Sequence, residues 1–306
     1  MKKMMFLAAI AAVALQGCVK ETSHSTIGNE LIGFKAFNEV AARGPIDGET
    51  YPDGGEFKVF AVYNNGSAAY FEPTTFAKEG TVWTGETPRY WPTTGVLDFA
   101  AYHPAALAGT VTPTYSGGIS KIEIAGIDNK DAQEDIMFSN LIDDAACTNH
   151  TSRSMVFNHA LAQVEVKVKA NEASIYTITG ITLKETIQGG TLTISPATAS
   201  TAAAWTPSST KVDMPVVSAA TPVTTAATTV GNNVLVVPAN QTKLVVNYKM
   251  VGSDATFEHP IDLTSNGAWD MGKKYIYTIT FGAYEISFSP EVTDWGTPVE
   301  PSVPSI

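Results

Sequence analysis

The sequence predicts an all-β protein built from two antiparallel β-sandwich domains in tandem, and three observations favour this fold class. No stretch after residue 15 keeps the 3.6-residue apolar period of an amphipathic helix. Short runs of β-branched and aromatic residues are instead separated by Gly, Pro, Asn and Asp, a pattern typical of sandwiches and barrels. The length of 306 residues suggests two domains.

The predicted strands fall into two series. The first series comprises residues 57–63, 97–102, 121–124 and 136–138. The second begins at residues 164–169, which alternate strictly between apolar and polar side chains, as expected of a strand with one packed face. It continues through residues 175–183, 191–194, 234–237, 244–248, 275–281 and 286–288. We therefore expect an N-terminal domain over residues 44–150 and a C-terminal domain over residues 151–306.

The first 17 residues predict a secretory signal peptide. Lys2 and Lys3 precede a short apolar run over residues 4–15, and the run ends in Leu-Gln-Gly-Cys at Cys18. This ending fits a bacterial lipobox, in which the cysteine thiol receives a diacylglycerol and the chain is cut just before it. An ordinary signal peptide with an incidental cysteine is the alternative, but the spacing and flanks favour lipidation of Cys18. Several acyl chains anchor firmly, because each buried methylene contributes about 0.8 kcal/mol.

Residues 18–43 predict a tether followed by one isolated strand. The segment after Cys18 is polar, and residues 31–37 then read as a first strand. The strand is followed by Arg43, Gly44 and Pro45, a basic residue with a turn signal after it.

Composition excludes several classes of function. Charged residues are 16% of the chain, and removal of the signal peptide takes the net charge from −11 to −13. Nucleic-acid binding needs clustered Lys and Arg, so it is not expected. Once Cys18 is acylated, Cys147 is the one cysteine left. No intramolecular disulfide is then possible, and we interpret Cys147 as an inert buried thiol.

Motifs for catalysis or cofactor binding are absent from the sequence. No two of the five histidines have metal-ligand spacing, and there is no Gly-x-Ser-x-Gly elbow or phosphate-binding glycine loop. Residues 128–135 contain several acids that could ligate calcium, but they lack the EF-hand glycine and glutamate, so a solvated turn is favoured. The pairs Glu134-Asp135 and Asp143-Asp144 could serve a glycosidase only if folding brought two carboxylates together. We therefore predict no enzyme, cofactor or metal.

The tryptophans have two readings. An aromatic residue beside a proline or at a strand end is usually a core plug, although it can also form a platform for a sugar. We interpret as core plugs Trp83, Trp91, Trp205, Trp269 and Trp295. His159 is similarly interpreted as a hydrogen-bonded core histidine rather than a metal ligand.

Several motifs, taken in order over nearly the whole chain, carry a family resemblance. Besides the lipobox and the strand before Arg43, they are Tyr-Trp-Pro at residues 90–92, Leu-Asp-Phe-Ala-Ala-Tyr-His-Pro at 97–104, Asp-Ile-Met-Phe-Ser at 135–139, Met-Val-Phe-Asn-His-Ala-Leu-Ala-Gln-Val at 155–164, and the ending at 286–295. Together they resemble the fimbrillin (Mfa-like) family, the lipoprotein pilus subunits of anaerobic Gram-negative bacteria.

The resemblance implies two transthyretin-like sandwiches and assembly by strand exchange. In that scheme a protease cuts after Arg43, the mature chain starts at Gly44, and the first strand leaves its groove. A donor strand, expected within residues 284–306, comes from another copy or another pilus subunit. The family also implies display on the outer membrane; a Lys-acid export signal after Cys18 is only partly matched, by Lys20 and Glu21.

Two other functions remain open on the sequence. A tip adhesin, or a surface lipoprotein that binds a glycan or receptor without polymerising, would use exposed aromatics such as Trp83 or Trp205. A surface enzyme would need acids or histidines gathered in a pocket.

Overall fold

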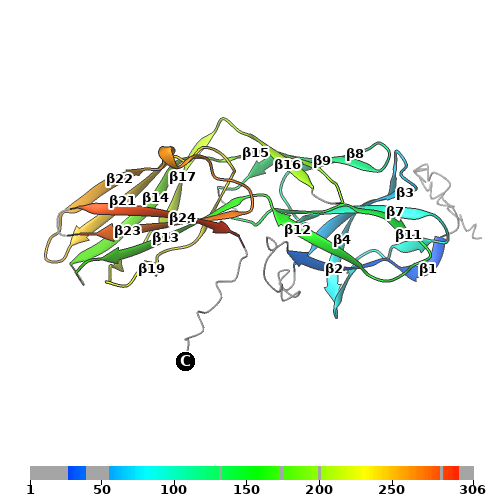
Figure 1. Ribbon diagram of the computed structural model, residues 1–306, viewed down its shortest axis with the longest axis horizontal. Helices are drawn as coiled ribbons and strands as arrows, with labels where there is room; N and C mark the ends of the chain where they lie inside the picture. Colours follow the sequence, from blue (N-terminus) through cyan, green and yellow to red (C-terminus); the bar gives the residue numbers. More distant parts are fainter. Residues whose placement is uncertain are drawn as a thin grey trace, which may run out of the picture.

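A computed structural model describes residues 27–38, 55–130, 133–172, 175–198, 201–282 and 285–295. The described residues form strands and loops with a single 3-10 turn, η1 Thr264–Asn266, so the all-β prediction is confirmed. The molecule is elongated, with two lobes side by side along its long axis (Figure 1). In the described part of the chain, no helix has the length and hydrophobicity needed to cross a membrane.

An eight-stranded sheet forms the main wall of the first lobe, in the order β10-β12-β2-β5-β4-β3-β7-β11. In that order the strands are β10 Met137–Ser139, β12 Arg153–His159, β2 Gly33–Asn38, β5 Val82–Gly85, β4 Ala69–Glu79, β3 Phe57–Tyr63, β7 Val96–His103 and β11 Ile142–Ala146. β10 also pairs with β7, which closes the strands from β10 to β7 into a ring. Beside this ring, β1 Ile27–Leu31 pairs with β6 Tyr90–Pro92.

The second lobe is a sandwich of two five-stranded sheets. One sheet has the order β19-β13-β23-β24, with β20 also on β13. Its strands are β13 Ala162–Ala170, β19 Thr228–Thr229, β20 Val234–Val236, β23 Lys273–Phe281 and β24 Ile286–Asp294. The other has the order β17-β14-β21-β22, with β18 also on β14. Its strands are β14 Tyr176–Ile187, β17 Lys211–Val217, β18 Thr221–Pro222, β21 Lys243–Met250 and β22 Thr256–Asp262.

A four-stranded sheet, β16-β15-β9-β8, joins the two halves of the chain. β8 Thr110–Tyr115 and β9 Ile119–Asp128 come from the first half, and β15 Gly189–Ser195 and β16 Ala202–Pro207 from the second. These strands lie along the upper side of the molecule and connect the lobes (Figure 1). The division into residues 44–150 and 151–306 stays a prediction, because strand pairing does not by itself define a folding unit.

Alternation along the strands explains how each lobe buries its core. In β13, for example, Val164, Val166 and Val168 are completely buried while Lys167 and Lys169 alternate with them. In the first lobe both faces of β3 are covered: Phe57, Val59 and Ala61 are completely buried in one core cluster, and Phe60 and Val62 are completely buried in another. Two pairings are parallel, β2 with β12 and β13 with β23. Both join segments far apart in the sequence, so no hairpin signal could have predicted them.

Candidate functional site

The first described strands of the chain close the ring of the first lobe. β2 lies between β12 and β5. Its residues 34–38 pair in parallel with residues 153–157 of β12. On the other side, Gly33 is opposite Thr84 and Phe34 is opposite Trp83 of β5. β2 therefore satisfies the edges of two strands that would otherwise carry unpaired backbone N–H and C=O groups.

The inner face of this segment is fully buried. Ile32, Phe34 and Ala36 are 1%, 0% and 2% exposed. The Phe34 ring makes edge-on contacts with Phe76 and Phe99, both at 5.1 Å between ring centroids. Large apolar side chains of this kind stabilise a fold by roughly 1.5–3 kcal/mol each when buried. If the segment left, an apolar trench lined by aromatic rings would open beside the two unpaired strand edges.

At the end of β1 the chain is less deeply buried. Leu31 is 50% exposed and lies opposite Tyr90 of β6. The Ile32 N–H donates to the Arg89 carbonyl at 2.8 Å. The attachment of this segment to the first lobe therefore depends mainly on the side chains of Ile32, Phe34 and Ala36.

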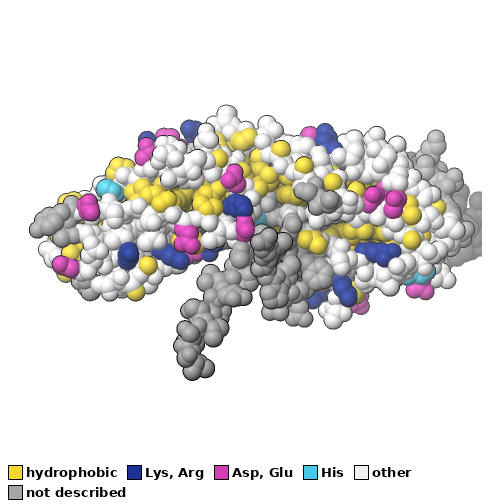
Figure 2. Space-filling view, in the orientation of Figure 1, with side chains coloured by type: hydrophobic (Ala, Val, Ile, Leu, Met, Phe, Trp, Pro, Cys, Tyr) yellow, Lys and Arg dark blue, Asp and Glu magenta, His cyan; other side chains and the backbone are white. Residues whose placement is uncertain are grey.

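The last described strand, β24, is an edge strand of the second lobe. It pairs along its whole length with β23, from Ile286 opposite Phe281 to Asp294 opposite Lys273. Its apolar side chains are not deeply buried: Phe288 is half-buried against Tyr277, and Val292 is 54% exposed. A band of hydrophobic side chains runs along this lobe beside β24 (Figures 1 and 2).

Trp295 fixes the end of β24 at the junction of the lobes. Its ring stacks on His159 with the ring centroids 3.9 Å apart, and its N–H donates to the Gly272 carbonyl at 2.9 Å. His159 is 8% exposed and contacts the Asp135 carboxylate at 2.9 Å. This pairing agrees with the interpretation of His159 as a hydrogen-bonded core residue. His159 and Trp295, with Lys273 and Asp294, are among the residues that line a cleft of about 500 Å³.

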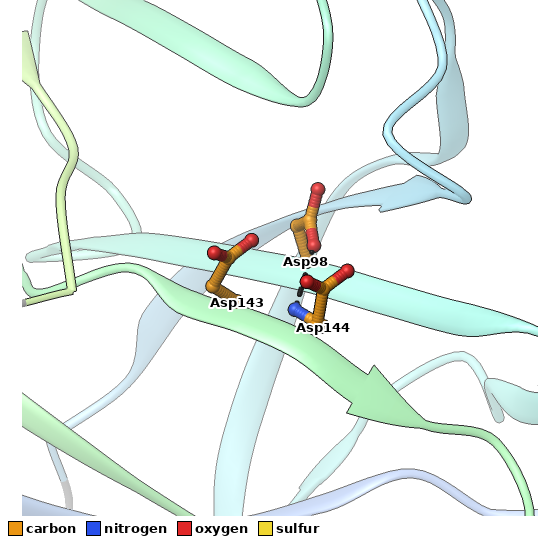
Figure 3. Close-up of side chains that lie close together, drawn as sticks. All are labelled: Asp98, Asp143 and Asp144. Atoms are coloured by element: carbon orange, nitrogen blue, oxygen red, sulfur yellow. Dashed lines mark hydrogen bonds between the residues drawn. The ribbon is translucent and has the colours of Figure 1, made fainter.

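An acidic cluster lies elsewhere in the first lobe, where β7 and β11 pair (Figure 3). Asp98, Asp143 and Asp144 each offer a carboxylate oxygen within 4.8 Å of the others. Asp98 is 1% exposed and accepts a hydrogen bond from the Asp144 backbone N–H at 3.0 Å. Burial raises the pKa of Asp98 to about 6, and the neighbouring carboxylates add to that rise while the Asp144 N–H opposes it.

The sequence singled out Asp143 and Asp144 but missed Asp98. Strand pairing across 46 residues brings Asp98 to them, and no local pattern carries that information. Asp98 sits among buried neighbours in β7, and an acid within an apolar strand is the signal that could have found it. Acidic clusters are common without a bound ion, and the described residues give no further sign of a ligand here.

The acids of residues 128–135 are not gathered into a site within the described part of the chain. Asp128 accepts hydrogen bonds from the Lys130 backbone N–H at 2.9 Å and from Gln188 at 2.7 Å. The Asp135 carboxylate contacts the His159 ring, as described above. Asp131 lies outside the described residues. The described geometry favours the solvated-turn interpretation of this segment.

The other candidates from the sequence are mostly core residues. Cys147 is fully buried, and burial raises the pKa of its thiol to about 11, so little thiolate forms at neutral pH. Trp83, Trp91 and Trp269 are at most 5% exposed. The half-buried Trp205 donates its indole N–H to the Ala160 carbonyl at 2.6 Å. None of these four tryptophans presents a free platform for a sugar.

The structure does not describe the residues predicted for lipidation and for proteolytic processing. Cys18, Arg43 and Gly44 lie outside the described residues, and their roles stay predictions.

Comparison with known proteins gives the family. The family model described as fimbrillin-like matches residues 47–295. The chain belongs to the fimbrillin-like family. This assignment covers both lobes and agrees with the resemblance found in the sequence motifs. A search of curated proteins found no matching relative.

Solved structures support the fold of this fimbrillin-like chain. A fimbrial protein from Bacteroides vulgatus is similar with a TM-score of 0.61 and 15% identity, over 87% of this chain and 100% of that one. A candidate cell adhesion protein from Bacteroides uniformis is similar with a TM-score of 0.58 and 18% identity, over 87% and 99%. Another candidate cell adhesion protein, from Bacteroides ovatus, is similar with a TM-score of 0.54 and 16% identity, over 87% of this chain and 98% of that one. At these identities the likeness concerns the fold alone.

Proposed function

We propose that this fimbrillin-like chain is a structural subunit of a surface pilus, exported as a lipoprotein and assembled by protease-triggered strand exchange in support of cell adhesion. The observation that carries the proposal is the position of β2. It is one of the first strands of the chain, yet it closes a ring of strands and fills the core of the first lobe. A strand in that position can be removed by a single cut on its C-terminal side.

The cut leaves the site of β2 between β12 and β5 unchanged, but it changes which strand can occupy that site. While β2 is covalently attached, its effective concentration at its own site is high, so a strand from another molecule cannot displace it. Cleavage after Arg43 removes this advantage. The backbone edges of β12 and β5 and the trench around Phe34 then accept an extended segment from another subunit by β-augmentation.

β24, the described part of the expected donor region, belongs to the second lobe, whereas β2 lies in the first, so a head-to-tail contact between copies is heterologous. Repetition of a head-to-tail contact that does not close gives an open filament, which is the geometry of a pilus. Acyl chains on Cys18 hold the precursor at the outer membrane until the cut separates the anchor from the subunit. A pilus subunit that assembles in this way needs no enzyme activity, cofactor, metal or nucleic acid.

Digestion of the folded precursor tests the proposal. A trypsin-like protease should cut preferentially after Arg43 and give a product that begins at Gly44 and forms a ladder on native gels. The Arg43→Ala variant should stay monomeric under the same conditions. If the cut product stays a monomer with β2 still bound, the polymerising role is wrong, and an anchor, tip adhesin or other receptor-binding lipoprotein becomes the better description.

A further inference from the structure

The cleft at the junction of the lobes has the size of a small-molecule site. Residues of β10 and β12 in the first lobe, of β16 in the joining sheet, and of β23 and β24 in the second lobe line it. Its volume of about 500 Å³ lies within the range of ligand pockets, roughly 300–1,000 Å³. A molecule bound there would contact all three parts of the protein.

The buried ring of His159 presents an acceptor to this cleft. Nδ1 contacts the Asp135 carboxylate, and because a carboxylate only accepts hydrogen bonds, Nδ1 carries the proton and Nε2 is the acceptor of the neutral ring. Nε2 has no hydrogen-bond partner among the described residues, yet it is not one of the fully buried polar atoms that lack a partner. It is therefore open to the cleft that His159 lines. An unpartnered nitrogen on a side chain only 7% exposed is a group that a ligand can satisfy.

The Trp295 indole N–H is the matching donor. Within the described part of the chain it has no acceptor, and like His159 Nε2 it is not sealed in the interior. The stack of the indole on the His159 ring, 3.9 Å between centroids, fixes the donor beside the acceptor. Lys273 and Asp294 line the same cleft and add an ammonium donor and a carboxylate acceptor.

The charges of the cleft leave no place for a charged ligand. Lys273 and Asp294 are the charged residues among the described ones that line it, and they form an ion pair with each other. An anion would have to displace Asp294 from Lys273 and would also lie near the Asp135 carboxylate behind His159. A cation would have to displace Lys273. Breaking such a pair leaves a charge without its partner, so the cleft favours a neutral molecule.

We propose that this cleft binds a neutral sugar unit. A hydroxyl group both donates and accepts, so two neighbouring hydroxyls of a sugar match the acceptor His159 Nε2 and the donor Trp295 N–H. Phe138 and Met271 also line the cleft and offer an apolar wall to the C–H groups of a pyranose ring. This combination of apolar lining and a few convergent polar groups is typical of sites that select a small molecule by orientation.

This inference goes beyond the proposed function and needs neither the cut nor the exchange of strands. It requires β24 to lie on β23, as the structure shows, because Asp294 and Trp295 follow from that pairing. The test therefore uses the full-length chain with Cys18→Ala and Arg43→Ala, which carries neither the predicted lipid nor the predicted cut site.

Saturation-transfer NMR with separate sugars measures binding to this uncut chain. The neutral probes are galactose, mannose and N-acetylglucosamine, and glucuronic acid is the charged comparison. We expect saturable binding of at least one neutral probe and none of glucuronic acid. Trp295→Phe keeps an aromatic ring on His159 but removes the N–H, so it should weaken binding by about three- to tenfold. Val292→Ala, at an exposed position of β24 outside the cleft, is the control and should bind like the parent chain.

His159→Phe tests the acceptor in the same way, since it keeps a ring against Trp295 and removes Nε2. It should also weaken binding by about three- to tenfold. Should this variant fail to fold, because Asp135 loses its contact, Trp295→Phe decides the matter alone. A chain truncated after Trp295 should bind the sugar as the parent does; if only the truncated chain binds, the end of the chain itself is the occupant of the cleft and the proposal is wrong.

The remaining outcomes are equally definite. If none of the three neutral probes binds, or if glucuronic acid binds more tightly than they do, the ligand class is wrong. If a neutral sugar binds and Trp295→Phe leaves its affinity unchanged, the site lies elsewhere. None of these results bears on assembly: a cut wild-type chain that forms no ladder would overturn the polymerising role and leave the sugar site standing, and a ladder without sugar binding would do the reverse.

Discussion

Replacing Asp98 by asparagine should stabilise the protein at neutral pH. The Asp98 side chain is 1% exposed, and its carboxylate lies within 4.8 Å of those of Asp143 and Asp144. Asparagine has nearly the same shape and keeps an oxygen that can accept the Asp144 N–H. The substitution therefore removes the buried charge while leaving the packing and that hydrogen bond in place.

The magnitude and the pH dependence follow from the pKa of Asp98. Its pKa is raised from 3.8 to about 6 in the folded state. Because the folded pKa is the higher one, the stabilisation due to the bound proton is fully present below pH 3.8 and is lost as the pH rises through 6. A shift of about two units corresponds to about 3 kcal/mol. We expect the free energy of unfolding of Asp98→Asn to exceed that of wild type by about 1–3 kcal/mol at pH 7.5. At pH 4 the two free energies should differ little.

Urea unfolding followed by tryptophan fluorescence measures this difference, at several pH values between 4 and 8 in the presence of a chelator. Asp143→Asn is the matched control, because it removes a neighbouring exposed charge and should stabilise less. The reasoning is refuted if Asp98→Asn destabilises the protein at pH 7.5 or if the difference is independent of pH. Stabilisation of wild type but not Asp98→Asn by added calcium would show a cation site in place of a buried, repulsive cluster.

Three further predictions concern anchoring, assembly and the second core. Cys18→Ala should release the protein from membranes or block removal of the signal peptide, and unchanged detergent partitioning would argue against lipidation. Truncation after Phe281 should leave a lipidated chain that cannot polymerise; normal filaments from it would place the donor elsewhere. Lys274→Ala should cost about 2–4 kcal/mol in denaturant unfolding, because it leaves the buried Glu165 carboxylate without its closest cation. A Lys211→Ala control, at an exposed ion pair with Glu185, should stay within about 1 kcal/mol of wild type.

The all-β class was predictable because it depends on local pattern. Alternation in residues 164–169 determines which side chains are buried wherever that strand pairs, and the structure places Val164, Val166 and Val168 in the core. The inert character of Cys147 and the core role of Trp91 followed from the same preference of apolar side chains for the interior.

The tertiary structure alone decided which strands are neighbours. The parallel contact of β2 with β12 and the closure of the ring by β10 and β7 join segments that no turn connects. The cluster of Asp98 with Asp143 and Asp144 arises in the same way, as does the stacking of His159 on Trp295.

The sequence by itself predicted a strand with an apolar face over residues 31–37 and another strand over residues 286–288. The structure decided that the first of these strands lies inside a closed ring and the second at an open edge. Side-chain periodicity is a local property of a strand, whereas its neighbours depend on long-range backbone hydrogen bonding and on the space left in the core.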